Sequence, residues 1–143
     1  MKVLVIYDSR FGNTQTIAEA IAHELEATVI HVAKISHEDL VGYDLLVVGS
    51  PINGWRPSQN MKKFLSSLKK GQLSGMKATA FDTRVKIFLH GNAANRIAKR
   101  VQSLGAEIIA KPEGFYVKGK NGPLLYGEIE RAKEWAKIIK ASI

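Results

Sequence analysis

The feature that most constrains the fold is a regular alternation of short apolar runs with longer amphipathic stretches. Residues 2–7 (KVLVIY) are nearly continuous in apolar character, which is typical of a strand buried on both faces of a sheet. Residues 13–26 instead place apolar residues at helical spacing. The pattern predicts strands at residues 2–7, 28–32, 44–49, 78–82 and 107–110, and helices at residues 13–26, 58–69, 92–104 and 127–141.

Strands that alternate with helices indicate a doubly wound α/β fold, because parallel neighbours need right-handed crossover connections. We therefore predict a five-stranded parallel sheet in a three-layer sandwich. At 143 residues the chain has the length of one ordinary domain, so residues 1–143 are expected to form a single domain. The SHED segment at residues 36–39 is predicted to be a capped turn. In the last helix, Ile129 and Trp135 are expected on the buried side with Ala132, Ala136 and Ile139.

Composition limits the chemistry that the chain can perform alone. There is no cysteine, which excludes disulfides, a thiolate nucleophile and a cysteine-bound iron–sulfur cluster, so redox chemistry needs a borrowed cofactor. The four histidines are scattered without metal-ligand spacing, and we expect no metal. No apolar run is long enough for a membrane span or a signal peptide, which favours a cytoplasmic protein. The net charge of +8 favours anionic ligands, acidic partner proteins or nucleic acid.

The loop after the first predicted strand has the composition of a phosphate-binding loop. Residues 8–14 (DSRFGNT) open onto a helix N-terminus, where unpaired N–H groups and the helix dipole favour an anion. Ser9, Asn13 and Thr14 add side-chain donors, and Gly12 lets the backbone come close to a ligand. A plain helix-capping turn is the alternative interpretation. The chain has neither GxGxxG nor GxxxxGK[ST], and it lacks the clustered acids of a receiver domain.

A second loop, residues 49–58 (GSPINGWRPS), follows the third predicted strand. Two prolines stiffen it, and Asn53-Gly54 is a dipeptide that tolerates positive φ. Trp55 is a large aromatic residue at a position outside the core pattern, where a flat ligand can stack on it. The alternative is a tryptophan that only covers the end of the sheet. Ligands of doubly wound sheets bind at this edge, so the two loops together predict a site for a planar ring that carries one phosphate.

These motifs resemble the flavodoxins over essentially the whole chain. The resemblance rests on residues 7–22 (YDSRFGNTQTIAEAIA), 43–55 (YDLLVVGSPINGW) and 90–109 (HGNAANRIAKRVQSLGAEII). It implies the strand order 2-1-3-4-5, FMN as cofactor, phosphate contacts from the first loop and ring contacts from the loops after the third and fourth strands. The residues expected to bind FMN are Ser9, Arg10, Phe11, Gly12, Asn13, Thr14, Ser50, Pro51, Ile52, Asn53, Gly54, Trp55, Thr83 and Arg84.

The chain also departs from the flavodoxin pattern. Phe11, next to Arg10, stands where flavodoxins often have a second hydroxyl residue, and the loop after the fourth strand has no tyrosine to cover the outer ring face. Phe88 and His90 are the candidates for that cover. Flavodoxins are typically acidic, whereas this chain is basic, so its redox partners are expected to have acidic docking surfaces.

The leading hypothesis is an FMN-binding protein that acts in electron transfer or as a small flavin-dependent oxidoreductase. No side chain needs to act as an acid or base, because the flavin carries the chemistry. The alternative is a basic flavodoxin-fold scaffold that binds an acidic partner or nucleic acid without flavin chemistry. Nucleic acid is disfavoured because the lysines lie on helical solvent faces without interleaved aromatic residues. A nicotinamide-dependent quinone reductase stays open as a third hypothesis.

Overall fold

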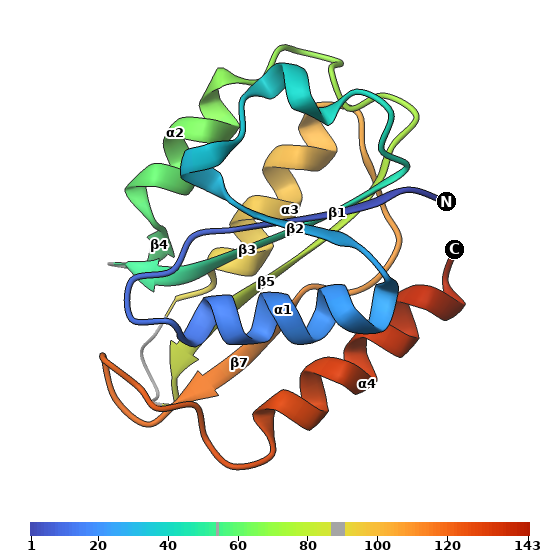
Figure 1. Cartoon of the computed structure of the whole chain (residues 1–143). Helices are drawn as coiled ribbons and strands as arrows, with labels where there is room; N and C mark the ends of the chain where they lie inside the picture. The colour runs from blue at the N-terminus through green and yellow to red at the C-terminus, as the bar shows by residue number, and fades with distance from the viewer. Residues whose placement is uncertain (54, 87–90) are drawn as a thin grey trace.

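A computed structural model describes residues 1–53, 55–86 and 91–143. It has a central β-sheet between two layers of helices (Figure 1). The main path of the sheet runs in the order β2-β1-β3-β5-β6, with every neighbouring pair parallel. These strands are β1 (Val3–Tyr7), β2 (Thr28–His31), β3 (Leu45–Asn53), β5 (Lys77–Val85) and β6 (Glu107–Ile108). The predicted doubly wound sheet and its strand order are confirmed.

The fifth position of the sheet differs from the single strand predicted at residues 107–110. It holds two short strands, β6 and β7 (Glu113–Val117), which both pair with β5 in parallel. Two extra residues separate them, since Lys77 pairs with Glu107 but Phe81 pairs with Glu113. Pro112 lies in this interruption and has no N–H for the ladder. The hydroxyl of Thr79 bridges the gap by donating to the carbonyl of Ala110 at 2.9 Å.

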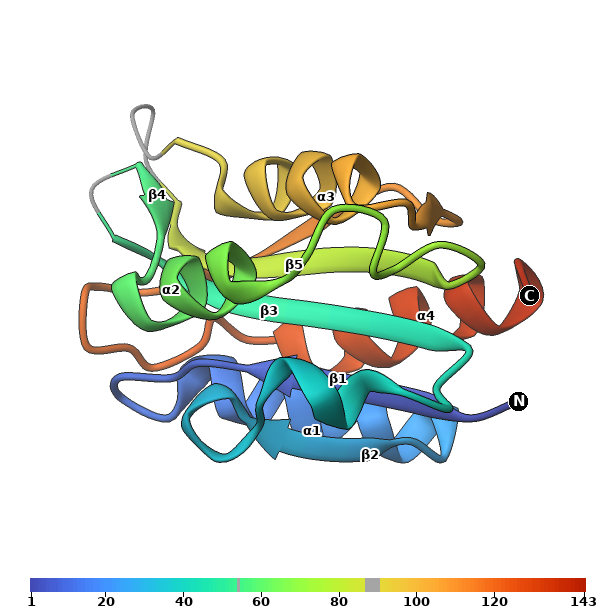
Figure 2. The ribbon, with the colours of Figure 1, turned by 90° about the horizontal axis from the view of Figure 1, so that it is seen from above.

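Helices cover both faces of the sheet (Figures 1 and 2), and the described residues form four α-helices. Helices α1 (Asn13–Leu25) and α4 (Glu128–Ala141) lie on one face, and α2 (Gln59–Ser67) and α3 (Ala93–Ser103) lie on the other. Short polar side chains set two of the helix starts: Ser58 caps α2 by accepting from Met61 N–H, and Asn92 caps α3 by accepting from Asn95 N–H. The turns η1 (Val32–Lys34) and η2 (His37–Leu40) complete the helical elements, and a capping box at Ser36 confirms the predicted turn.

Both faces of the sheet are apolar, as its near-continuous runs predicted. Along β1, Leu4 and Ile6 join the core beneath α2 and α3, whereas Val3, Val5 and Tyr7 join the core beneath α1 and α4. This two-sided burial leaves the loops at the carboxyl ends of the strands as the places for polar function.

Helix α4 confirms one prediction for the core and corrects another. Trp135 is buried, packs edge-on against Phe81 and Phe115, and donates its indole N–H to the carbonyl of Lys111. Ile129, predicted on the buried side, is 36% exposed. The buried stripe instead begins one residue earlier at Glu128, which is four residues before Ala132 and therefore on the same face of the helix.

Candidate functional site

The loop between β1 and α1 is organised by the hydroxyl of Ser9. Its Oγ accepts from the backbone N–H of Gly12 at 3.1 Å and of Gln15 at 3.3 Å. Gly12 is the residue before α1 and has a φ of 91°, a left-handed conformation that glycine adopts without steric penalty. Because Gly12 has no side chain to cap the helix, Ser9 supplies an oxygen from three residues earlier. The loop therefore folds back over the N-terminus of α1.

Several backbone N–H donors at this N-terminus have no acceptor among the described residues. Within the described residues, the N–H groups of Arg10, Phe11, Asn13 and Thr14 have no protein acceptor. The first N–H groups of a helix carry its partial positive charge, so they attract an anion. This arrangement suits a phosphate group.

The side chains of Asn13 and Thr14 connect this loop to the loop after β7 and to strand β5. Thr14 is 2% exposed, and its hydroxyl shares a hydrogen bond of 2.8 Å with the hydroxyl of Thr83, at the end of the sheet. One hydroxyl of the pair donates to the other, and the accepting hydroxyl keeps its own hydrogen for a ligand. Asn13 packs so closely on Gly122 that a Cβ there would lie 2.6 Å from its amide. The loop after β7 is thereby held against the start of α1.

The second predicted loop is partly a β-hairpin, which corrects the prediction that the strand ends at Gly49. Strand β3 continues to Asn53 and pairs antiparallel with β4 (Arg56–Pro57). The extension is possible because β5 still pairs with β3 beyond the last β1 partner, and Pro51 lies where β1 has ended. Ser50, fully buried, ties the hairpin base: its Oγ accepts from Ser58 N–H and donates to the carbonyl of Pro51, both at 2.9 Å.

Trp55 lies at the turn of this hairpin in a strained conformation. Its φ is 73°, which is uncommon for a bulky residue, and its side chain is half exposed. A Cβ on Gly91 would lie 2.6 Å from Trp55 Cα, so the segment before α3 contacts the hairpin turn. Such strain is found where surrounding contacts impose it, often at binding sites. The neighbouring predicted residue Gly54 lies outside the described residues.

A cleft of about 640 Å³ opens between the two loops. One side is formed by Ser9, Arg10 and Phe11, and another by Pro51, Ile52 and Asn53. Its volume falls within the roughly 300–1,000 Å³ of small-molecule sites. Other predicted residues do not line this cleft, namely Gly12, Asn13, Thr14, Ser50, Trp55, Thr83 and Arg84.

The cleft also has lining residues that the sequence analysis missed, and they are Asp8, Ser58, Gln59, Asn60 and Lys120. Lys120 belongs to the loop after β7, a strand that was not predicted. Because that strand was not predicted, the sequence pattern did not indicate that residues 118–123 (KGKNGP) lie at the binding edge of the sheet. The residues that begin α2 reach the cleft only because the hairpin folds back, which the sequence pattern did not indicate.

The charges around the cleft favour an anion. Asp8 is buried, accepts from Ser9 N–H at 2.9 Å, and lies 3.2 Å from Nε2 of His31. The Ser9 N–H and the His31 ring thus stabilise its negative charge. Within the described residues, two cations line the cleft, namely Arg10, which lies over the ring of Phe11 at 5.7 Å, and Lys120.

The carboxyl end of β5 holds a buried ion pair. Asp82 is 0% exposed and receives Nε and Nη2 of Arg84 at 2.7 and 2.6 Å, together with Ala94 N–H at 2.9 Å. Nη2 of Arg84 also lies 3.3 Å from the side-chain oxygen of Asn92. The charge of Arg84, predicted near the cofactor, is therefore neutralised by Asp82. Phe88 and His90, the candidates for covering the ring, lie outside the described residues.

The described residues contain neither a cluster of metal ligands nor a helix that could span a membrane. No three His, Asp or Glu side chains within them are grouped so as to hold a metal ion. No helix within them has the length and apolar composition of a membrane span.

Comparison with known proteins identifies the family. A model of the flavodoxin domain matches residues 4–117. The chain belongs to the flavodoxin family. An uncharacterised protein of Methanocaldococcus jannaschii is 32% identical and aligns over 97% of this chain and 98% of its own length. A flavodoxin of Aquifex aeolicus is 41% identical over 57% of this chain and 49% of its own length. The crystal structure of oxidised flavodoxin 2 from Bacillus cereus has the same fold, with a TM-score of 0.87 and 21% identity over the full length of both chains.

Flavodoxins bind FMN, so the family membership confirms the cofactor predicted from the sequence. The residues of this flavodoxin fit that group. Unpaired N–H donors at the start of α1 suit its phosphate, and the cleft beside them has the volume of a small-molecule site. The family acts in FMN-dependent electron transfer or flavin-dependent oxidation and reduction with redox partners.

Proposed function

We propose that residues 1–143 form a single flavodoxin domain that works as an FMN-dependent electron carrier. FMN lies in the cleft between the loop of residues 9–14 and the β3–β4 hairpin. The observation that carries this proposal is that unpaired N–H donors at the start of α1 lie beside a cleft lined by cations and by the partly apolar end of β3. A planar ring that bears a single phosphate needs both kinds of surface.

The phosphate is assigned to the loop of residues 9–14. The N–H groups of Asn13 and Thr14 donate to it, and the Thr14–Thr83 pair offers it a hydroxyl hydrogen. Ser9 and Gly12 shape the loop, and Arg10 and Lys120 add positive charge from the cleft wall.

The ring is assigned to the ends of β3 and β5. Pro51, Ile52 and Asn53 form one wall of the cleft, and Trp55, half exposed at the hairpin turn next to Gly54, is assigned to cover the part of the ring that extends beyond this wall. Ser50 stabilises the base of the hairpin that forms this wall, and Thr83 and Arg84 stabilise the end of β5. When bound, FMN supplies the capacity to take up and release electrons one or two at a time. The protein binds it, orients it and excludes water, and no side chain is assigned as an acid or base.

An electron carrier and an enzyme differ in the molecules that exchange electrons with the flavin. A relative from Cupriavidus metallidurans, named NAD(P)H dehydrogenase (quinone), is 33% identical over 56% of this chain and 55% of its own length, so a quinone reductase is the competing function. The net charge of +8 favours redox partner proteins with acidic docking surfaces. The cytoplasm is the proposed location, and nucleic acid is not proposed as a partner.

The test uses the FMN-loaded protein without oxygen. We expect dithionite to reduce the bound flavin and ferricyanide to reoxidise it, whereas NADH and NADPH with a quinone give no sustained turnover. The absorbance of the flavin reports each step. Fast reduction by NADH or NADPH with continuous quinone turnover would assign the enzymatic role, and a protein that binds no FMN would contradict both.

A further inference from the structure

The net positive charge of this chain comes from one part of the sequence, residues 45–106. Residues 45–106 contain eleven Lys or Arg and a single acid, Asp82, a net charge of +10. The remaining residues contain ten Lys or Arg and twelve Asp or Glu, a net charge of −2, which together give the total of +8. Asp82 is fully buried and paired with Arg84, so it does not reduce the surface potential of this part.

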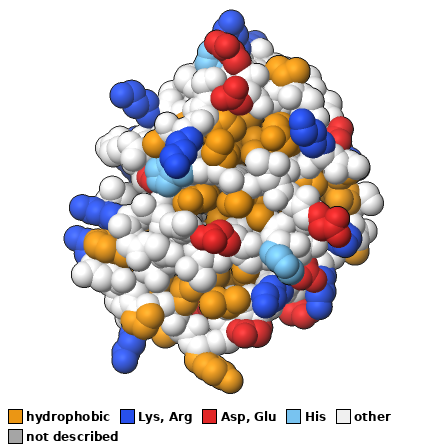
Figure 3. Space-filling view, in the orientation of Figure 1, with side chains coloured by type: hydrophobic (Ala, Val, Ile, Leu, Met, Phe, Trp, Pro, Cys, Tyr) orange, Lys and Arg blue, Asp and Glu red, His pale blue; other side chains and the backbone are white. Residues whose placement is uncertain are grey.

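This basic part forms one face of the molecule. Residues 45–106 include α2 and α3, which cover one face of the sheet together (Figure 2). By contrast, the face seen in Figure 3 shows acidic and basic side chains interspersed. The residues of this protein that interact with an acidic surface are therefore expected on the side of the molecule that α2 and α3 form.

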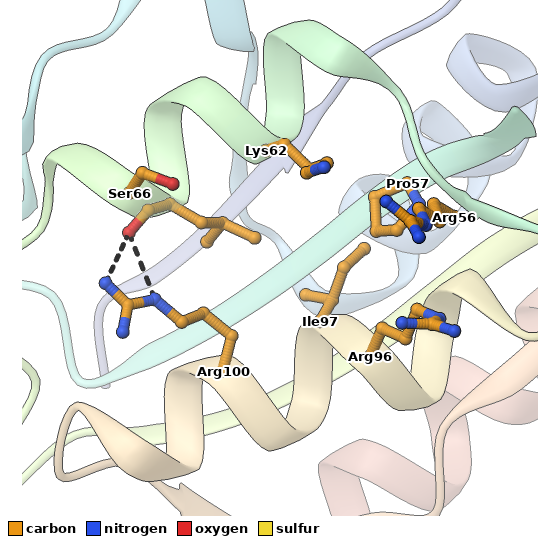
Figure 4. Close-up of a pocket in the computed structure, with 8 residues that line it drawn as sticks. Arg56, Pro57, Lys62, Ser66, Arg96, Ile97 and Arg100 are labelled. Carbon is orange, nitrogen blue, oxygen red and sulfur yellow. Dashed lines mark hydrogen bonds between the residues drawn. The ribbon is translucent and has the colours of Figure 1, made fainter.

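A basic groove lies between α2 and α3 (Figure 4). It has a volume of about 230 Å³ and an apolar floor of Pro57, Leu65 and Ile97. Its cationic residues come from β4, α2 and α3, and they are Arg56, Lys62, Arg96 and Arg100. Among residues 1–53, 55–86 and 91–143, neither an acidic nor an aromatic residue lines it.

Three of the four cations are available to a ligand. Arg100 is engaged, because its Nε and Nη2 donate to the carbonyl of Leu65 at 3.3 and 3.2 Å and so hold α3 to α2 (Figure 4). The side chains of Arg56, Lys62 and Arg96 are exposed and have no hydrogen bond or ion pair within the described residues. Like charges left together without counter-ions attract an anionic partner.

The groove is continuous with the proposed FMN cleft. A hollow of about 270 Å³ lies between them. It shares Asn53 and Gln59 with the cleft, and Arg56 and Lys62 with the groove. A polypeptide bound in the groove would lie beside the β3–β4 hairpin, close to the cofactor.

We propose that the α2–α3 groove docks an acidic segment of the redox partner protein. This inference rests on the proposed electron-carrier function. Carboxylates of the segment pair with Arg56, Lys62 and Arg96, while an apolar side chain rests on the floor formed by Leu65 and Ile97. A polypeptide fits better than a nucleic acid, because single-stranded nucleic acids bind by stacking on aromatic side chains, and no aromatic residue lines the groove in the part of the chain that the structure describes.

The test measures binding of a fluorescein-labelled peptide of eight glutamates with one central leucine, by fluorescence anisotropy. The groove variant carries Lys62→Glu and Arg96→Glu, which leave the β3–β4 hairpin unchanged. The control variant carries Lys133→Glu and Lys140→Glu, which make the same change in net charge on α4, across the sheet from the groove. We expect the groove variant to bind the peptide more than about tenfold more weakly than the wild type, and the control less than about threefold more weakly. High salt should weaken binding to the wild type most.

Three outcomes would overturn the proposal. One is an equal loss in both variants, which would show that only net charge matters. Another is no peptide binding at all. The third is tighter binding of an oligothymidylate of equal charge, with the same dependence on the groove residues, which would assign the groove to nucleic acid. FMN affinity is measured separately on all three proteins and should be unchanged, so a failure to bind FMN contradicts the proposed function without deciding the peptide result.

Discussion

At the scale of single residues, the proposed site depends on groups that combine structural and binding roles. Thr14 is the clearest case, since its hydroxyl is paired with Thr83 and also lies at the first turn of α1. The sequence alone indicated Thr14 as a phosphate ligand but gave no sign of its partner. Any test of binding must therefore separate loss of the ligand contact from loss of the threonine pair.

Thr14→Ala should weaken FMN binding by about 1.5–3 kcal/mol, because a hydrogen bond to the phosphate is lost. Riboflavin, which has no phosphate, should bind the variant nearly as it binds the wild type. Thr83→Ala is the matched control, because it removes the same hydroxyl pair and leaves Thr14 in place. Flavin fluorescence titrations give all the affinities. If Thr14→Ala weakens riboflavin as much as FMN, the loop does not bind the phosphate.

Lys120→Ala should weaken FMN binding by about 0.5–1 kcal/mol, since it removes an exposed positive charge from the cleft wall. Lys118→Ala is the control, because this exposed lysine comes from the same loop and does not line the cleft. The difference between the two variants should shrink at high salt. An equal effect of both substitutions on the FMN titration would mean that Lys120 has no specific role.

At the scale of elements, most strands and helices were predictable because their apolar patterns match the two faces of the sheet. The failures have local physical causes. Strand β7 was missed because Pro112 interrupts the ladder before it, and the extension of β3 was missed because Pro51 reads as a strand end unless the shorter β1 is known. The first loop of the site was predictable from helix-start chemistry. The contribution of Lys120 was not, since it depends on the missed strand.

Helix α4 is attached to β7 by a carboxylate at its first turn. Glu128 accepts from Tyr116 N–H at 2.7 Å and from Nε and Nη2 of Arg131 at 3.0 and 2.8 Å. Burial alone would raise the pKa of Glu128, but the hydrogen bonds from Arg131 and Tyr116 outweigh it and the net effect lowers the pKa. The ionised form is thus favoured by folding.

Glu128→Gln should lower the free energy of unfolding by about 1–3 kcal/mol at neutral pH, because it removes charge-assisted hydrogen bonds. A carboxyl whose pKa is lowered in the folded state stabilises the protein above its unfolded pKa of about 4.3, and this contribution is lost as the pH falls through the folded value. The difference in stability between the two proteins should therefore shrink once the pH falls below the unfolded pKa, and it should disappear below the folded pKa. Urea unfolding at several pH values measures this, and a difference that is constant with pH would contradict it.

At the scale of the whole molecule, the uneven charge distribution determines how the protein meets its partners. The cleft adjoins the basic α2–α3 face, and the cations Arg10 and Lys120 line the cleft itself. The net charge follows from the composition, but its position relative to the site does not, because that position depends on which helices share a face. The fold places the excess positive charge on the side from which the cofactor is proposed to exchange electrons.

Small charged oxidants test this field directly. The reduced FMN-loaded protein should be oxidised by the ferricyanide anion at a rate that falls as salt rises, and by the hexaamminecobalt(III) cation at a rate that rises with salt. Stopped-flow absorbance measures both. Because each reagent is compared only with itself across salt concentrations, differences in their redox potentials do not enter. Salt slopes of the same sign for both reagents would show that the field at the cofactor is not positive.

The central claim is that the loop of residues 9–14 and the β3–β4 hairpin together form a site for FMN. The most direct measurement is equilibrium titration of the wild-type protein with FMN and with riboflavin. We predict one FMN per chain, bound more than about tenfold more tightly than riboflavin, because the phosphate gains several charge-assisted hydrogen bonds at the α1 N-terminus. Equal affinity for the two flavins, or no binding of either, would contradict the account.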